Sequence, residues 1–248
     1  MSAMRMAIMQ PYFFPYLGHF SLIAAVDEWI VFDITQYTPR TWMNRNRILG
    51  PQGGWQWLTV PLARSSIHMR THEAAVQDLE RTRQGMLGRL GHYRRAPYWR
   101  GVSGLVEDTF ATTDPSLTRL NARGLDRVCQ YLGLPFHARV CSELAIHLPD
   151  SPGPGQWAPA ICAALGADTY VNPAGGEALF DPADFDRCGV KPLLLESEPF
   201  TYQPGQHAFE AGLSILDVLM WNPPDAVRAA LDCYRLMPLE QRPAIKHL

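Results

Sequence analysis

Residues 36–47 hold the densest group of side chains that could bind a ligand. Two asparagines alternate with two arginines over residues 44–47. Guanidinium groups bind phosphate or carboxylate oxygens in bidentate fashion, so this run predicts a site for a sugar phosphate, a nucleotide or a phosphopantetheine thioester. The expected contacts are Gln36, Tyr37, Arg40, Asn44, Arg45, Asn46 and Arg47. The alternative is that an arginine pairs with Asp33 or Glu143 inside the fold while the asparagines cap turns.

A second candidate is the aromatic segment of residues 10–19, which follows an apolar run. Proline cannot donate to a central strand ladder, so Gln10-Pro11 predicts that the strand stops and a loop begins. Aromatic rings with polar tips suit the face of a sugar or a nucleobase. We expect Gln10 and Tyr12 to contact a ligand, whereas Phe13 and Phe14 are expected to fill the core.

The Gly18-His19 pair in the same segment allows a different reaction class. A strand, a proline-containing loop, a Gly-His pair and a helix resemble the start of HxGH-type nucleotidyltransferases. There a helix N-terminus and histidines stabilise a transferring phosphate. The first histidine of that motif is missing here. Under this alternative, His19 is a catalytic residue.

Cys141 is a candidate nucleophile for acyl transfer. A thiolate can act with a histidine base and an orienting carboxylate, and His137 and His147 are near in sequence. Glu143 is expected on the same side of a strand as Cys141, because side chains alternate with period two. Glu143 is also a candidate base, and Ser142 a candidate substrate contact. The alternative is that Cys141 is a buried structural residue.

No metal-binding motif is present, since His68 and His72 are four residues apart with no third ligand at a recognisable spacing. Asn172 opens an Asn-Pro-Ala-Gly-Gly segment after a predicted strand. Its glycines would let backbone amides approach an anion, although a plain turn is the alternative. We therefore expect Asn172 to contact substrate, and we expect no bound metal or cofactor.

Composition excludes several classes of function. With 22 basic and 24 acidic residues the net charge is −2, which disfavours binding to a nucleic-acid backbone. No apolar run reaches the roughly 18 residues that a membrane span needs, and the start does not suit a signal peptide. Five cysteines without CxxC spacing support neither a disulfide framework nor a zinc ribbon. We expect a cytoplasmic protein that binds neither nucleic acid nor membrane.

The apolar pattern predicts an α/β fold. Residues 6–9 and 29–32 are typical of buried strands, with a helix over residues 20–26 between them. The loop of residues 10–19 then lies at the carboxyl end of a strand, where open sheets bind ligands. After this β-loop-α-β unit, which starts a mixed or parallel sheet, we expect a mainly helical middle and a second α/β lobe. The other expected helices are residues 87–93, 115–132, 157–165, 214–220 and 225–234, and the other expected strands are 55–62, 169–171 and 192–195.

The segment of residues 149–155 has three prolines and two glycines, the strongest loop signal in the chain. We expect residues 1–248 to form a single unit. The loop signal allows this unit to consist of two lobes joined near residues 149–156.

Four blocks of sequence resemble the WbqC-like family. They are residues 8–18 (IMQPYFFPYLG), residues 36–48 (QY and RTWMNRNRI), residues 142–144 with 165–170 (SEL and LGADTY), and residues 213–217 (LSILD). The first two blocks are long and unusual in composition, which makes them specific. Two positions depart from the family pattern: Cys141 replaces the first of two serines, and the helix before Tyr93-Arg94-Arg95-Ala96-Pro97 lacks the usual Trp and has its only His next to Tyr93.

The resemblance implies a role beside enzymes of O-antigen, amino-sugar or specialised-metabolite assembly. We interpret the protein as an N-acyl or aminoacyl transferase that takes its group from an activated thioester, on coenzyme A or an acyl carrier protein, and places it on an amino-sugar or small amine. The alternatives are a nucleotide-binding or nucleotidyltransferase-like enzyme that uses Gly18-His19, and a non-catalytic partner of a tailoring enzyme.

Overall fold

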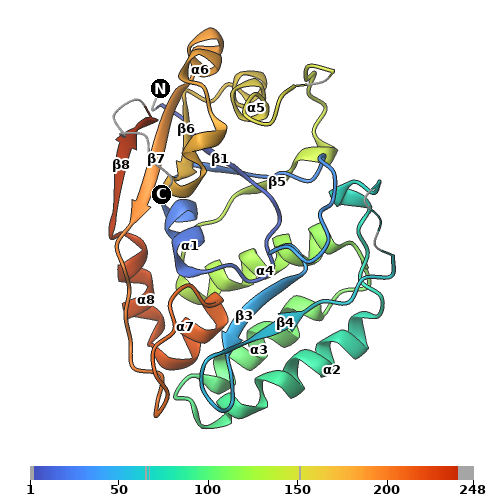
Figure 1. Cartoon of the computed structure of the whole chain (residues 1–248), viewed down its shortest axis with the longest axis vertical. Coiled ribbons are helices and arrows are strands. Elements are labelled where there is room, and N and C mark those ends of the chain that lie inside the picture. The colour runs from blue at the N-terminus through green and yellow to red at the C-terminus, as the bar shows by residue number, and fades with distance from the viewer. Residues whose placement is uncertain (1–2, 65, 67, 151, 240–248) are drawn as a thin grey trace, which may run out of the picture.

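The central feature of this computed structural model is a sheet with the strand order β5-β2-β1-β6-β7-β8. The structure describes residues 3–64, 66, 68–150 and 152–239. All neighbouring strands run parallel except β8, which is antiparallel to β7. The strands are β1 (Arg5–Met9), β2 (Glu28–Val31), β5 (Ala138–Val140), β6 (Thr169–Pro173), β7 (Lys191–Ser197) and β8 (Tyr234–Pro238) (Figure 1). The predicted mixed α/β fold is confirmed.

The strand order reverses at β1. From β1 the chain passes to β2 and β5 on one side, whereas β6 and β7 are added on the other side. The connections that leave the carboxyl ends of β1 and β6 therefore diverge. In open parallel sheets this is the usual position of a ligand.

Side chains of the sheet alternate between two hydrophobic clusters. In β1, Ala7 belongs to the larger cluster, whereas Met6 and Ile8 belong to the smaller one, because successive side chains of a strand point to opposite faces. The covering helices are α5 (Trp157–Leu165) and α6 (Pro182–Cys188) on the smaller cluster, and α1 (Leu17–Ala24) and α8 (Pro224–Leu231) on the larger one.

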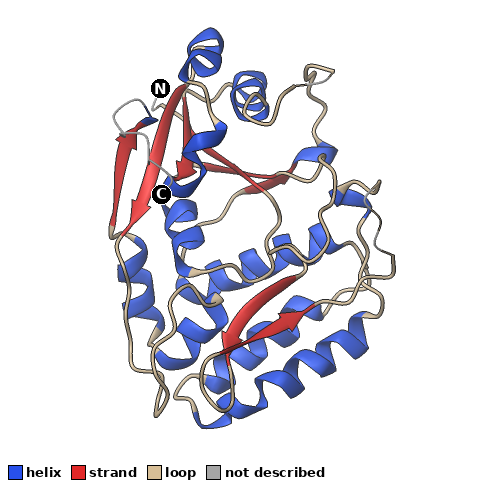
Figure 2. Ribbon diagram, in the orientation of Figure 1, coloured by secondary structure: helices blue, strands red, loops and turns tan. Residues whose placement is uncertain are grey.

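The larger cluster continues into a helical layer that carries a β-hairpin of β3 (Arg45–Leu49) and β4 (Trp55–Thr59). The hairpin packs with β3 against α7 and with β4 against α2, and Figure 2 shows its two strands lying over the helices. The helices of this layer are α2 (Leu79–Arg89), α3 (Trp99–Phe110), α4 (Leu117–Leu132) and α7 (Ile215–Trp221).

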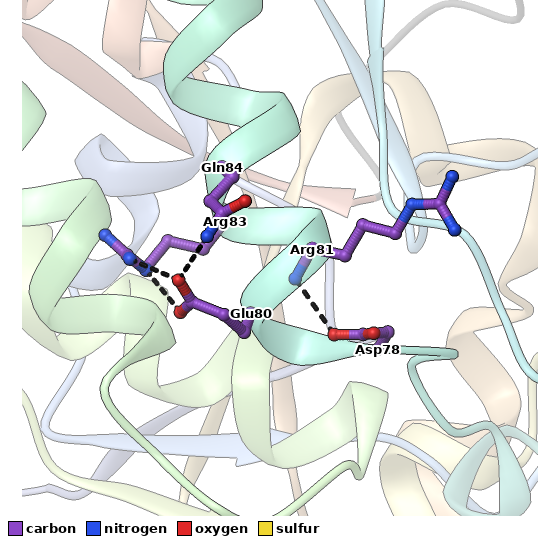
Figure 3. A network of polar contacts seen from close by, with 5 residues as sticks. All are labelled: Asp78, Glu80, Arg81, Arg83 and Gln84. Carbon is purple, nitrogen blue, oxygen red and sulfur yellow. Dashed lines mark hydrogen bonds and ion pairs between the residues drawn. The ribbon is translucent and has the colours of Figure 1, made fainter.

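Helix α2 begins at an N-terminal cap, where the Asp78 carboxylate accepts a hydrogen bond of 2.9 Å from the Arg81 backbone N–H. In the first turn, Glu80 accepts hydrogen bonds from the side chains of Arg83 and Gln84, which lower the pKa of Glu80 to about 2. Figure 3 shows that the Arg81 guanidinium takes no part in these bonds and extends away from Glu80.

Three local predictions need correction. The polar pattern of residues 36–48 predicts no strand, but Arg45–Leu49 form β3. The helix predicted over residues 225–234 ends at Leu231, because Tyr234–Pro238 pair with β7 as an edge strand. The placement of Cys141 and Glu143 on one side of a strand is wrong, because β5 ends at Val140 and Cys141–Glu143 form a 3-10 turn.

The segment of residues 149–156 separates two parts of the chain that contribute to one sheet, since β1 pairs with β6. Ser151 of that segment lies outside the described residues, and the division into two lobes stays a prediction. Within the described ranges, no helix has the length and apolar character of a membrane span. The same residues contain no cluster of three or more His, Cys, Asp or Glu side chains that suits a metal ion.

Candidate functional site

The loop after β1 is held by side chains from two distant segments that meet at the Phe14 carbonyl. Asn46 Nδ2 donates to this oxygen at 2.8 Å and Ser214 Oγ donates at 2.7 Å. Phe14 has a φ of 37°, an unfavourable conformation for a side chain of this size. The two hydrogen bonds oppose this strain and fix the loop that carries Tyr16 and the start of α1.

Other asparagines also act inside the fold. Asn121 Nδ2 lies 2.7 Å from both the Pro11 and the Met43 carbonyl oxygens, and Asn44 Nδ2 donates to the Val60 carbonyl at 3.2 Å. The predicted ligand segments, residues 10–19 and 36–47, therefore lie side by side. Asn46 and Asn121 join them through hydrogen bonds to buried backbone carbonyls, whereas Asn44 is bound to Val60. The Nδ2 groups of Asn44 and Asn46 are therefore already used inside the fold.

The outer face of the hairpin gathers three tryptophans around two arginines. We call Trp42, Arg45, Arg47, Trp55 and Trp57 the tryptophan–arginine face. Arg45 Cζ lies 4.0 Å from the centre of the Trp57 ring, and Arg47 Cζ lies 5.5 Å from Trp42 and 5.4 Å from Trp55. Trp42 and Trp55 are 38% and 45% exposed. Such exposed aromatic surface beside cations suits a flat or anionic ligand.

Neither arginine of this face has a carboxylate partner among the described residues: Asp33 is bound by Ser142 and Glu143 pairs with Arg119. The Nε atoms of Arg45 and Arg47 are buried and have no hydrogen-bond acceptor over the same part of the chain. The alternative of an internal pair with Asp33 or Glu143 is therefore wrong.

A pocket lies where the strand order reverses. It consists of a hollow of about 230 Å³ and an adjoining one of about 180 Å³, which share Tyr16, Gly18 and Ser197. We call the two together the switch-point pocket. Its walls come from the start of α1, the segment after β6, the end of β7 and residues 198–213.

The charged side chains of this lining are all acidic, and they lie beside aromatic rings. Glu196, Glu198 and Glu210 contribute carboxylates, and no Lys, Arg or His is among the described residues that line either hollow. The rings of Tyr16 and Phe209 are 41% and 38% exposed. This chemistry favours a ligand with a positive charge and a flat or ring-shaped body.

Gly18 is fixed by close packing in this pocket. A Cβ atom at this position would lie 2.6 Å from Tyr16 Cε2 and 2.8 Å from Ser197 Oγ. Real Cβ contacts are not this short, so a larger residue would displace the Tyr16 ring or the end of β7. The glycine of the Gly18-His19 pair therefore has a packing role at the pocket.

A buried carboxylate supports the pocket wall from behind. Asp217 is 1% exposed and accepts hydrogen bonds from the hydroxyls of Tyr93 and Tyr202, and Tyr202 lines the pocket. Burial raises the pKa of Asp217 and of both tyrosines. The Leu49 N–H completes the network by donating to Tyr93 Oη at 2.8 Å, which links the pocket wall to the hairpin.

Arg47 connects the tryptophan–arginine face to the switch-point pocket. Its Nη2 donates to the Gly212 carbonyl at 3.2 Å, and Gly212 lines the pocket. The backbone pairs in the same place, because the Ser214 N–H donates to the Arg47 carbonyl at 2.8 Å. A cationic aromatic surface and an acidic pocket thus share a boundary.

His19 is enclosed by the fold. It is 1% exposed, and its ring centre lies 4.9 Å from that of Trp29 and 5.6 Å from that of Tyr12. Burial lowers the pKa of His19 to about 3, so the imidazole is neutral at neutral pH. An enclosed neutral ring is poorly suited to stabilise a transferring phosphate.

Cys141, Ser142 and Glu143 lie at the far edge of the sheet, after β5. Burial raises the pKa of the Cys141 thiol to about 12, whereas a nucleophilic cysteine needs a lowered pKa. Ser142 donates to Asp33 through its N–H at 2.9 Å and its Oγ at 2.8 Å, and Glu143 pairs with Arg119. None of the three lines the switch-point pocket.

The remaining predicted contacts are spread over several surroundings. Asn172 accepts from Tyr170 Oη at 2.8 Å and donates to the Pro173 carbonyl at 2.9 Å, so it shapes the loop beside the pocket. Tyr37 is 1% exposed. The others are Gln10 and Tyr12, which are partly buried, and Gln36 and Arg40, which are exposed.

Several residues of the candidate site are not predicted from the sequence. They belong to the switch-point pocket and the tryptophan–arginine face: Tyr16, Trp42, Trp55, Trp57, Ser197, Glu198, Tyr202, Phe209, Glu210 and Gly212. One signal existed, since Trp55 and Trp57 alternate just as Arg45 and Arg47 do. Two alternating pairs this close in sequence indicate one face of a hairpin.

Comparison with known proteins identifies the family. The model of the WbqC-like protein family matches residues 10–229, which include both ligand segments and the lining of the switch-point pocket. The chain belongs to the WbqC-like protein family. It is similar to a protein of Mycobacterium tuberculosis (strain ATCC 25618 / H37Rv) named Uncharacterized protein Rv1507c, with 29% identity over 218 residues that cover 87% of this chain and 92% of that relative. No solved structure matches.

The structure shows the surroundings of both departures from the WbqC-like pattern. At the first departure, Ser142 alone makes both hydrogen bonds to Asp33, while Cys141 is buried beside it. At the second, His92 Nε2 lies 2.9 Å from the Leu49 carbonyl. In this WbqC-like protein the histidine therefore contacts the hairpin and does not line the switch-point pocket.

Proposed function

We propose that this WbqC-like protein is an amide-forming transferase that moves an acyl or aminoacyl group from a phosphopantetheine thioester to the amine of an amino-sugar or a related small molecule. The observation that carries the proposal is the contact between Arg47 and Gly212, because it joins the tryptophan–arginine face to the acidic pocket. An anionic donor and a cationic acceptor would meet at that boundary. The family resemblance suggests surface-glycan or specialised-metabolite assembly as the setting.

The tryptophan–arginine face supplies the donor side. Arg45 and Arg47 keep guanidinium N–H groups without carboxylate partners among the described residues, and a pantetheine phosphate accepts such donors in bidentate fashion. Trp42 and Trp55 provide exposed ring faces beside them, on which the thin pantetheine arm can lie. The arm would pass over Arg47 toward Gly212.

The switch-point pocket supplies the acceptor side. Glu198 and Glu210 attract an ammonium group, and the rings of Tyr16 and Phe209 offer apolar faces to a sugar or similar body. About 230 Å³ in the main hollow suits a small molecule and excludes a polymer chain from its interior. The acidic lining disfavours the phosphate of the donor here, so the two substrates take separate positions.

The reaction requires loss of a proton from the acceptor, since an ammonium cannot attack a carbonyl. The amine nitrogen forms a bond to the thioester carbonyl carbon. The C–S bond breaks, and the pantetheine sulfur leaves as a thiolate that takes up a proton. We assign the role of base to Glu210, which is partly buried in the pocket lining, in place of Glu143 at the far edge of the sheet.

The test is amide formation from coenzyme A thioesters. Purified protein is incubated with acetyl, hydroxyacyl and glycyl thioesters of coenzyme A and a panel of amino-sugars, and products are measured by mass spectrometry with free thiol release. Arg45→Ala is expected to raise the donor KM about tenfold or more through loss of a phosphate contact. Its acceptor KM should stay unchanged, because Arg45 does not line the pocket. An Arg45→Ala variant with unchanged donor KM contradicts the assigned donor face.

A nucleotide-binding function is the second candidate, favoured by the strand order β5-β2-β1-β6-β7 and a pocket beside the point where it reverses. The glutamates of the lining and the enclosed His19 argue against a bound phosphate there. Magnesium-dependent release of pyrophosphate from nucleoside triphosphates, with no amide from any thioester, would favour this candidate. If neither assay gives a product and a tailoring enzyme co-purifies stably with the protein, a role as a non-catalytic partner would be favoured.

A further inference from the structure

Helix α2 and the turn after it form the most basic stretch of the chain. Residues 79–100 contain six arginines and a single acidic residue, Glu80, although the whole protein has a net charge of −2. Glu80 is already paired with Arg83. The exposed arginines of this stretch have no carboxylate within ion-pair distance among the described residues; they are Arg81, Arg89, Arg94, Arg95 and Arg100.

A groove of about 620 Å³ runs between this helix and the edge of the hairpin. Arg81, Gly85 and Arg89 line it at intervals of four residues, which places them on one side of the helix. Asp78 also lines it, but its carboxylate caps the helix. Figure 3 shows the Arg81 side chain extended away from Glu80.

The glycines of helix α2 lower its stability. A glycine in an exposed helix costs about 1 kcal/mol relative to alanine, and α2 contains Gly85 and Gly88 three residues apart. A Cβ atom at either position would meet nothing within 4 Å, so packing within this chain does not require them. A flat helix surface without side chains allows another helix to approach closely.

The groove is continuous with the proposed donor face. Thr59 lines the groove and lies directly opposite Arg45 in the hairpin register. Residues opposite each other in an antiparallel pair project from the same face. A ligand that leaves the groove past Thr59 therefore reaches Arg45 and the Trp57 ring beneath it.

We propose that this groove, lined by Arg81, Gly85 and Arg89, docks an acidic helix of a carrier protein whose phosphopantetheine arm extends over Thr59 onto the tryptophan–arginine face. The inference rests on the proposed function, and it specifies that the donor thioester is carried by a protein. Unpaired arginines attract acidic side chains, the bare backbone at Gly85 lets the two helices approach, and the continuity with Arg45 gives the arm its path. A nucleic acid would use the arginines but gains nothing from the bare helix surface at Gly85.

The experiment measures binding and transfer with three purified acidic acyl carrier proteins in holo form, together with coenzyme A thioesters as donors without a protein. Arg81→Glu combined with Arg89→Glu is expected to weaken carrier binding about tenfold or more. Gly85→Leu is expected to abolish close docking while the melting temperature stays equal or rises, because leucine favours a helix. Turnover with coenzyme A thioesters should stay at the wild-type level in both variants.

The matched control is Lys191→Glu, which reverses an exposed charge at the start of β7 and should leave carrier binding unchanged. The inference is overturned if none of the three carriers binds the wild type, if the double variant binds them as the wild type does, or if an RNA competes for Arg81 and Arg89 while carriers do not. Its failure is separable from that of the proposed function. Amide formation from coenzyme A thioesters without carrier binding removes only the docking site, whereas carrier binding without amide formation from any thioester removes only the chemistry.

Discussion

Arg47 on the hairpin donates a hydrogen bond to the carbonyl of Gly212, at 3.2 Å and across 165 residues of sequence. Gly212 has a φ of +66°, and a Cβ atom there would lie 3.3 Å from Arg47 Nη2. The guanidinium therefore lies against bare backbone, with Trp42 and Trp55 beside it. This contact sets the boundary between the two halves of the proposed site.

Replacement of Arg47 should affect both substrates. Arg47→Lys keeps the charge but loses the planar fork of donors, so we expect the KM of donor and acceptor to rise together, with kcat/KM lower by about tenfold or more. Steady-state kinetics with each substrate varied in turn measures this. Arg235→Lys serves as the matched control, and an effect on the donor KM alone would contradict the bridging role.

Glu210→Gln tests the assignment of the base. The amide keeps the size of the side chain but cannot take a proton from the acceptor. We expect kcat to fall about a hundredfold, in line with loss of general base catalysis, while the acceptor KM changes little because Glu198 still attracts the ammonium. Glu177→Gln, a change outside the pocket lining, is the control. Equal loss in the two variants would argue against a specific role of Glu210.

Asn46→Ala tests the support of the loop after β1. The change removes the Asn46 hydrogen bonds to the carbonyl oxygens of Phe13 and Phe14. Each of these two buried oxygens then has one hydrogen bond fewer. We expect the free energy of unfolding to fall by about 2 to 4 kcal/mol, measured by urea denaturation. Gln130→Ala at an exposed position should change stability by less than about 0.5 kcal/mol. An Asn46→Ala protein as stable as wild type would show that Ser214 alone holds the loop.

His19 predicts a loss of stability in acid. Its pKa in the folded protein is about 3, below the ordinary value, so the unfolded chain binds the proton more readily. The stabilising contribution is complete above about pH 6.5 and is lost as the pH falls toward 3, at about 1.4 kcal/mol per pH unit. His19→Leu should remove this part of the slope in denaturation at several pH values. Gln206→Leu, at an exposed position without a titratable group, should leave the slope unchanged, and identical slopes in all three proteins would contradict the buried neutral imidazole.

Two glycines should respond to alanine in opposite ways. Gly85→Ala adds a Cβ atom into open space in α2, so we expect a gain of about 1 kcal/mol and a melting temperature higher by about 2 to 4 °C. Gly133 ends α4 with a φ of +62°, and Gly133→Ala should lower the melting temperature because alanine disfavours this conformation. Differential scanning calorimetry measures both. A lower melting temperature in Gly85→Ala would indicate a structural reason for the glycine within this chain.

The class of fold and the family could both be predicted from the amino-acid sequence. Buried strands such as residues 6–9 have an apolar pattern that needs no knowledge of the partner strand, and Gly133 marks a helix end because the backbone there adopts a positive φ. The same local patterns indicated that residues 10–19 form a loop at a strand end. The long blocks that resemble the WbqC-like family can also be recognised in the sequence, because each block is continuous in the chain.

Which of these residues are available to a ligand depends on how the chain packs in three dimensions. Asn44, Asn46 and His19 have side chains suited to chemistry, yet contacts with distant carbonyls or burial among rings give them structural roles. The switch-point pocket combines Tyr16 with residues 197–213, which come together only when β7 joins the sheet beside β6. Contacts over such separations depend on the packing of the whole chain and leave no local periodicity in the sequence.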